Sequence, residues 1–158
     1  MNVAPLRLAI AALALAAGTA LAQAPLAKYS ASGEFDAVKE DLLLAIQGRG
    51  LVVDHTSYIG NMLERTGKDV GAAKRVYLKA EAVQFCSAIV SRRTMEADPA
   101  NIAYCPYVIA LYVLAQEPGT VYAVYRRMGA TGEEATRAAL RAVDELLDGI
   151  VREGLNLK

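Results

Sequence analysis

The sequence predicts an α+β domain in which helices pack on one face of a single sheet, as a two-layer sandwich. Stretches with the two-residue period of strands alternate with stretches that repeat apolar residues at helical spacing. Near the C-terminus, two strand-like stretches flank the turn sequence Gln116-Glu117-Pro118-Gly119, and an amphipathic helix follows them. These observations predict the order βαβαβαββα, which one sheet with helices on one face accommodates.

The size and composition narrow the class of protein. The chain has 158 residues and a mass of 16.8 kDa, which suits a single domain. Its hydrophobic content of 54% excludes a disordered chain, and two cysteines exclude a disulfide-rich mini-protein. The 17 basic residues balance the 17 acidic residues, so no net field favours nucleic acid or an anionic membrane. We expect no nucleic-acid partner.

The N-terminus has the pattern of a secretory signal peptide. Arg7 is the one charge in residues 1–22, and an apolar stretch over 8–17 follows it. Ala20-Leu21-Ala22 supplies a small-x-small cleavage site, with cleavage after Ala22. The stretch is too short for a membrane anchor, which needs about 20 apolar residues. We expect a periplasmic or secreted domain over 23–158 that has no transmembrane anchor after cleavage.

Two strands and two helices are expected in the first half of this domain. The strands cover 26–32 and 51–59, and the second places His55 on one face with Leu51 and Val53. A short helix is expected over 59–66. The longer helix ends near Gly48 and Gly50, and its apolar positions are Phe35, Val38, Leu42, Ala45 and Ile46.

A strand over 81–86 comes next, followed by a helix over 88–97. Ser87 is a good N-cap for this helix, and Pro99 ends it. The strongest strand signal covers 102–114.

A partner strand is expected over 120–128, after the turn at 116–119. The capping box from Thr131 to Glu134 then opens a C-terminal helix over 132–153. Arg126 and Arg127 lie near a cluster of tyrosines, where they would support anion binding or remain solvated. Five of the eight tyrosines fall in the last two predicted strands, which indicates an amphipathic sheet surface or an aromatic binding face: Tyr104, Tyr107, Tyr112, Tyr122 and Tyr125.

The two cysteines allow three interpretations. In the first interpretation, Cys86 and Cys105 form a structural disulfide, which an oxidising exported location permits. Alternatively, Cys86 is a reactive thiolate at a helix N-terminus, within a redox or sulfur-handling pair. In the third interpretation they are buried thiols, or ligands to a metal or haem. A structural zinc site normally needs four ligands, so no metal is expected.

His55 is either a hydrogen-bonded core residue, an axial ligand to a non-covalent haem, or a proton donor in a pocket. The sequence lacks C-x-x-C-H, which excludes covalent haem attachment. It also lacks G-x-S-x-G and the nucleotide-binding glycine motifs, so no catalytic residue is assigned and a non-enzymatic protein is favoured.

The stretch from Phe35 to Arg127 resembles the bacterial "domain of unknown function 302" family. The matching landmarks run in order through the chain: Gly48-Arg49-Gly50-Leu51-Val52-Val53, Phe85-Cys86-Ser87-Ala88, Asp98-Pro99 and Tyr104-Cys105-Pro106-Tyr107. The resemblance implies an α+β domain that tends to form homodimers and has no established activity. Family members usually have Asn-Pro after the first cysteine and Pro before the second. This chain instead has Ser87-Ala88 after the first cysteine and Pro106 after the second. It therefore resembles an exported branch of the family.

Three functions remain open from the sequence. The first is a dimeric, exported binding or accessory protein for a small apolar molecule, haem or a sulfur species. Its pocket would lie near the cysteines. The second is a thiol-dependent redox or sulfur-handling protein that uses Cys86 and Cys105, and the third is a structural interaction domain. The candidate site residues are Cys86, Cys105, His55, Phe85, Tyr104 and Tyr107.

Overall fold

The fold is taken from a computed structural model, which describes residues 25–72, 74–129 and 132–158. The predicted signal peptide and Thr131 of the predicted capping box lie outside the described residues. Within the described part of the chain, no helix has both the length and the apolar character needed to span a bilayer.

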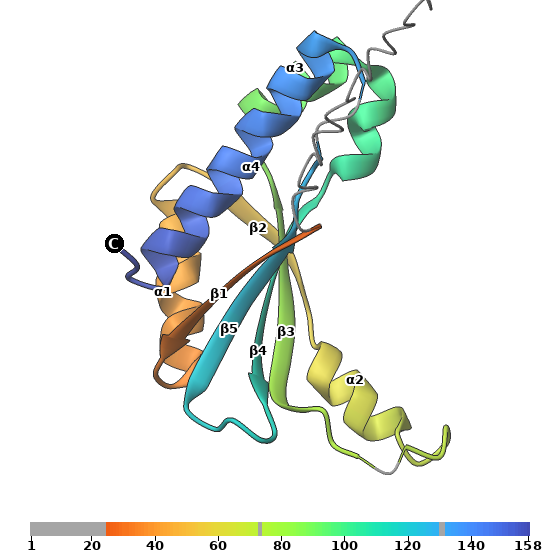
Figure 1. The fold of residues 1–158 in the computed structure, drawn as a ribbon, viewed down its shortest axis with the longest axis vertical. Helices are drawn as coiled ribbons and strands as arrows, with labels where there is room; N and C mark the ends of the chain where they lie inside the picture. The colour runs from red at the N-terminus through yellow and green to blue at the C-terminus, as the bar shows by residue number, and fades with distance from the viewer. Residues whose placement is uncertain (1–24, 73, 130–131) are drawn as a thin grey trace, which may run out of the picture.

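Five strands form one antiparallel sheet (Figure 1). In chain order they are β1 (Leu26–Ser32), β2 (Val52–Ser57), β3 (Tyr77–Cys86), β4 (Tyr107–Leu114) and β5 (Thr120–Arg126). In space their order is β1-β5-β4-β3-β2. The N-terminal strand therefore pairs with the last strand, and β4 lies in the middle of the sheet.

The helices lie on one side of this sheet and at its ends (Figure 1). α1 (Phe35–Gln47) and the long α4 (Glu134–Gly154) contact each other on the same side of the sheet. α3 (Ala88–Ala97) packs on α4 at one end, whereas α2 (Ile59–Thr66) contacts β3 near the opposite end. The predicted α+β architecture and its element order are confirmed.

The hydrophobic core lies between the sheet and the helices α1 and α4. Alternate residues of β4 and β5 are buried there, as expected for strands with one face covered. α1 buries the apolar positions that the sequence predicted. The largest fully buried side chains are Tyr107, Tyr125, Phe85, Leu42, Ile46, Ile109, Leu111, Leu140, Leu147, Ile150, Val83 and Val121.

Two predicted helix signals are present at α3. The Ser87 side chain accepts a hydrogen bond from the Val90 amide at 3.3 Å, so it caps the helix as predicted. α3 ends at Ala97, two residues before Pro99. The cap and the proline mark the two ends of α3, and the segments that carry Cys86 and Cys105 lie on either side of this helix.

The central strand β4 begins at Tyr107, so the prediction of a strand from Ile102 is wrong. Residues Pro99–Tyr104 form a 3-10 helix, η1. The Asp98 side chain accepts a hydrogen bond from the Ala100 amide at 2.9 Å, and proline favours the first turn of a helix. These local interactions favour a helical turn over the strand that the apolar pattern predicted. Tyr104 therefore lies in η1 and not in the sheet.

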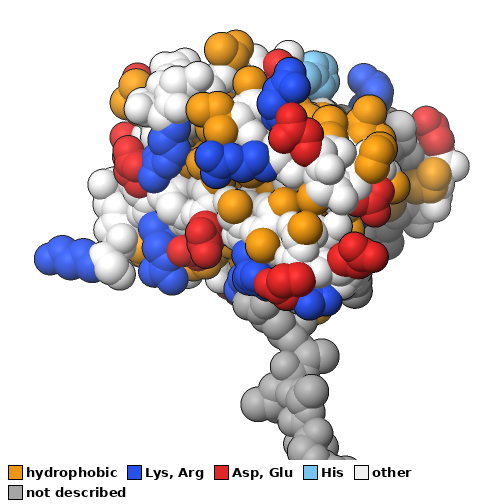
Figure 2. Space-filling view, turned by 90° about the horizontal axis from the view of Figure 1, so that it is seen from above, with side chains coloured by type: hydrophobic (Ala, Val, Ile, Leu, Met, Phe, Trp, Pro, Cys, Tyr) orange, Lys and Arg blue, Asp and Glu red, His pale blue; other side chains and the backbone are white. Residues whose placement is uncertain are grey.

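A β-bulge between Val53 and His55 changes which face of β2 each residue occupies. Val53 pairs with Phe85, which is in the core, whereas His55 pairs with Gln84. His55 is therefore not on the face of Val53, contrary to the alternation expected from the sequence. Its side chain is exposed and shows at the surface in Figure 2, so the core interpretation of the histidine is wrong.

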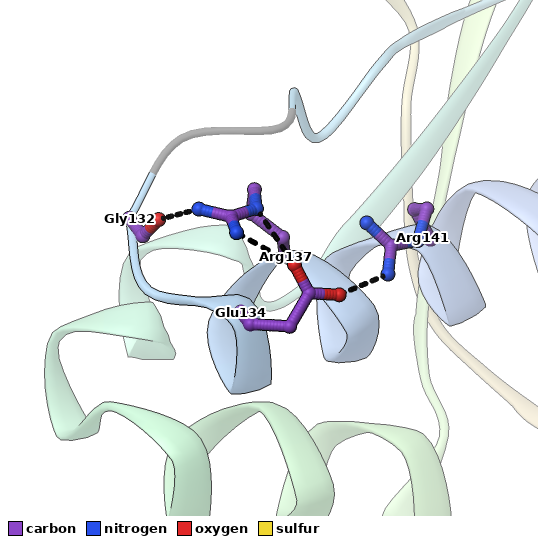
Figure 3. A network of polar contacts seen from close by, with 4 residues as sticks. All are labelled: Gly132, Glu134, Arg137 and Arg141. Atoms are coloured by element: carbon purple, nitrogen blue, oxygen red, sulfur yellow. Dashed lines mark hydrogen bonds and ion pairs between the residues drawn. The ribbon is translucent and has the colours of Figure 1, made fainter.

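α4 begins at Glu134, two residues later than predicted, because Gly132 has the positive φ of +93°. Figure 3 shows how its first turn is held. The Nε and Nη2 atoms of Arg137 donate to the Glu134 carboxylate at 3.1 and 2.6 Å. Arg141 Nη2 donates to the same carboxylate at 2.9 Å. Arg137 also donates to the Gly132 carbonyl at 2.5 Å. The Arg141 and Arg137 hydrogen bonds lower the pKa of Glu134.

Candidate functional site

The two cysteines form a disulfide at the end of the sheet. Cys86 is the last residue of β3, and Cys105 lies between η1 and β4. Their Cα atoms are 6.4 Å apart, and both residues are half-buried. The bond thus fastens the segment that precedes the central strand to the neighbouring strand. The bond excludes the interpretation of the cysteines as unpaired thiols, and it agrees with both a structural disulfide and the oxidised form of a redox pair.

A chain of buried polar side chains from α3 and η1 begins beside this disulfide. The Ser91 hydroxyl lies 3.7 Å from the Cys105 sulfur and 3.0 Å from the Tyr107 hydroxyl. Thr94 donates to the Ser91 carbonyl at 2.8 Å, and Asn101 donates to the Thr94 carbonyl at 2.8 Å. Burial raises the pKa of Tyr107, so its phenol stays neutral and can donate. The cluster fixes α3 and η1 against the start of β4.

A groove with a volume of about 360 Å³ lies beside the disulfide-bonded segment. It is formed by η1, the starts of β1 and β4, and the end of β5. Its volume lies at the lower end of the range of small-molecule sites. Arg126 provides an exposed positive charge on the groove. The apolar lining includes Leu26, Tyr104, Pro106, Val108, Ala110 and Val124.

The structure brings some of the predicted site residues together and separates others. Tyr104 and Tyr107 both border the groove, and they lie directly before and directly after the Cys105-Pro106 pair. Phe85 is fully buried and packs edge-on against Tyr107 with ring centroids 6.2 Å apart, so it belongs to the core. His55 lies on β2, at the far side of the sheet from β5 and β1. The groove therefore does not include His55, the residue considered from the sequence as an axial haem ligand.

The tyrosines divide between the two faces of the sheet. Tyr107 and Tyr125 face the core, whereas Tyr112 and Tyr122 stack on the opposite face with centroids 5.1 Å apart. The Lys28 ammonium lies 4.2 Å from the Tyr122 ring centroid. This pair gives the uncovered face of the sheet an aromatic centre.

A second polar cluster, between β1, β5 and α4, was not found from the sequence. The Tyr29 hydroxyl donates to Asp148, which also accepts from Arg152 Nε at 2.7 Å. Burial alone would raise the pKa of Asp148, but the hydrogen bonds from Tyr29 and Arg152 outweigh burial and lower it. Burial also raises the pKa of Tyr125, which stacks on Tyr29. The cluster ties the edge strand β1 to the long helix.

The groove residues Pro106, Val108, Ala110 and Val124 were also missed. A usable signal was present, because β4 is apolar on both faces where a strand with one solvated face would alternate with polar residues. Ser91 was missed because a serine inside a helix carries no sign of what it will contact. Among the described residues, no three of His, Cys, Asp and Glu come close enough together to hold a metal ion.

Figure 2 views the molecule from the end at which α3 lies. Basic and acidic side chains alternate over this face, with hydrophobic side chains between them. This view shows no broad field of one charge sign of the kind that steers nucleic acid.

Comparison with known proteins identifies the fold. No family model matches the chain, and no curated protein matches it. The structure is similar to the crystal structure of an uncharacterized conserved protein, DUF302, from Bacillus stearothermophilus. The match has a TM-score of 0.67 at 14% sequence identity, and covers 82% of this chain and 97% of that chain. The chain therefore has the fold of this DUF302 protein, as the sequence resemblance predicted.

Proposed function

We propose that the chain is an exported, non-enzymatic binding domain whose groove holds a small apolar molecule with an anionic group. The observation that carries this proposal is the apolar groove of about 360 Å³ beside the Cys86–Cys105 disulfide. Binding sites of small molecules are typically concave and mostly apolar, with a few polar groups that orient the ligand.

The lining supports both halves of the ligand's chemistry. Val108, Ala110 and Val124 form an apolar floor on neighbouring strands, and Tyr104 and Pro106 come from the adjacent segment. Arg126 can pair with a carboxylate, sulfonate or phosphate at the rim. The disulfide supports preorganisation, since it fastens the segment that carries Tyr104 and Pro106 to β3.

Dye titration tests this assignment. We use protein that begins at Gln23, which retains every described element, and the anionic dye 1-anilinonaphthalene-8-sulfonate. Val108→Asp places a charge in the groove and should weaken dye binding at least tenfold. Val52→Asp is the matched control, because Val52 is 73% exposed on β2, away from the groove. Equal dye affinity of both variants would overturn the proposal.

The role of Arg126 needs a neutral probe as well. Arg126→Gln should weaken binding of the anionic dye while leaving binding of the uncharged dye Nile red unchanged. Arg92→Gln, on the exposed surface of α3, should change neither affinity. Loss of both dyes in Arg126→Gln would indicate a damaged groove and contradict recognition of the anionic group.

A thiol-dependent redox function is the second candidate. It is favoured by the half-buried disulfide and by the Ser91 hydroxyl at 3.7 Å from the Cys105 sulfur, which can donate to a thiolate there. Titration of free thiols against glutathione redox buffers distinguishes the two functions. A disulfide that stays intact throughout the physiological range of potentials supports a purely structural bond, and reversible reduction within it supports the redox function.

Export and association complete the proposal. The N-terminal pattern supports cleavage after Ala22, which sequencing of the mature N-terminus checks.

We also infer a homodimer, as the family resemblance implies. The exposed face with the stacked Tyr112 and Tyr122 rings supports an association surface, which is also the third function open from the sequence. Sedimentation equilibrium should give twice the monomer mass.

A further inference from the structure

A second surface lies at the opposite end of the molecule from the groove. We call it the α2 tip, and it comprises residues 59–72 and 74–76. Figure 1 shows α2 leaving the sheet beyond the start of β3, while the groove is formed near the end of β3 and the start of β4. None of the α2 residues is buried. The helix is anchored at Gly60, where an added Cβ would lie 2.9 Å from the Ala80 nitrogen.

The α2 tip exposes apolar side chains at high density. Val70 is 76% exposed and Val76 is 48% exposed, and Met62 and Leu63 are each 40% exposed. Leu63, Val70 and Val76 also line a hollow of about 280 Å³ between α2 and the segment that follows it. The apolar side chains are therefore gathered at one place on the tip.

Basic side chains border the same hollow. Lys68, Lys74 and Arg75 line it, and Arg65 lies nearby on α2. The acidic residues of the tip are Glu64, which lies 3.5 Å from Arg75, and Asp69. Among the described residues no carboxylate forms an ion pair with Lys68 or Lys74.

The charge of the tip is opposite to that of the remaining described chain. The tip carries four basic and two acidic residues, and the rest carries twelve basic and fifteen acidic residues. We propose that the α2 tip docks the protein on an anionic phospholipid surface. Apolar side chains beside lysines and arginines are the pattern that binds such interfaces. The acidic remainder would be repelled, so the groove end points away from the lipid.

Sedimentation with lipid vesicles tests the docking. The probe is protein beginning at Gln23, with vesicles of phosphatidylcholine alone or mixed with phosphatidylglycerol. We expect binding to the anionic vesicles at 50 mM salt and its loss at 500 mM salt. Lys68→Gln with Lys74→Gln should lower the partition coefficient roughly fivefold per lysine. Val70→Asp should lower the partition coefficient further, because it replaces an apolar docking side chain with a negative charge. Val70 is 76% exposed, so this replacement should not unfold the protein.

Matched variants at the other end control for general effects. Arg92→Gln with Arg93→Gln removes two exposed charges from α3, and Ile89→Asp replaces an apolar side chain that is 68% exposed there. Neither should change vesicle binding. Equal binding to neutral vesicles, or equal losses in the tip and α3 variants, would overturn the proposal. Val108→Asp, which changes the groove, should bind the anionic vesicles as the wild type does, so the two proposals fail independently.

Discussion

At the scale of single residues, two glycines of α4 differ in what surrounds them. A Cβ at Gly154 would lie 2.7 Å from the Leu42 Cα, since α1 and α4 pack closely at this point. At Gly149 it would meet only the end of the Arg49 side chain, at 3.3 Å. Gly154 therefore sets the distance between the two helices, while Gly149 does not.

Gly154→Ala should lower the free energy of unfolding by about 1–3 kcal/mol, because the added methyl forces the helices apart. Gly149→Ala should lie within about 1 kcal/mol of the wild type or be more stable, since alanine favours a helix and the Arg49 side chain can move. Urea denaturation measures both. A Gly154→Ala protein as stable as Gly149→Ala would contradict this account of the packing.

The same scale shows why part of the site could not be predicted. The alternation in β2 was correct up to Val53, but the bulge before His55 depends on pairing with β3, which no local pattern records. Cys86 and Cys105 could be named from the sequence as partners. Their bond could not be assigned, because the register between β3 and β4 was unknown. Arg126 was predicted from the sequence as a charge near the tyrosines. Its position beside a groove could not be predicted, because the groove is partly formed by η1.

At the scale of elements, the structure differs from the sequence prediction where local bonds outweigh apolar patterning. Ser87 and Pro99 predicted the limits of α3, because a cap and a proline act on their immediate neighbours. Ile102 suggested a strand, although Asp98 followed by Pro99 is also a start signal for a helical turn. The boundaries marked by a cap or a proline were therefore predicted well, and the boundary inferred from apolar patterning alone was predicted less well.

The first turn of α4 gives a prediction at this scale. Glu134→Gln should lower the melting temperature at neutral pH, because the amide cannot form the ion pairs with Arg137 and Arg141. The pKa of Glu134 is lower in the folded than in the unfolded chain, so ionised Glu134 stabilises the fold above its ordinary pKa. This stabilisation is lost as the pH falls below the ordinary pKa of a glutamate, about 4.3, and through the lowered pKa of Glu134.

Thermal unfolding of both proteins between pH 3 and pH 7 measures this difference. The gap in melting temperature should close at the acidic end of the range. Glu133→Gln is the control, because the Glu133 side chain forms no capping hydrogen bond. A gap that stays constant with pH would show that ionisation of Glu134 does not stabilise the helix.

At the scale of the whole molecule, the disulfide links segments 19 residues apart and encloses α3 and η1. Replacing both cysteines by serine should lower the free energy of unfolding by roughly 3 kcal/mol, because the unfolded chain regains the freedom of that loop. Adding reductant to the wild type should cause the same loss, and the double variant should not respond to it. Denaturation with and without dithiothreitol measures this, and an unchanged wild type would contradict it.

The pairing of β1 with β5 has a consequence for the order in which the molecule is made. Leu26 pairs with Arg126, so a growing chain cannot close its sheet until residue 126 has been synthesised. The α1–α4 contact forms later still, since α4 is the last element. Such long-range pairing slows folding. The late closure of the β1–β5 edge is compatible with the proposed export, which would require an open chain.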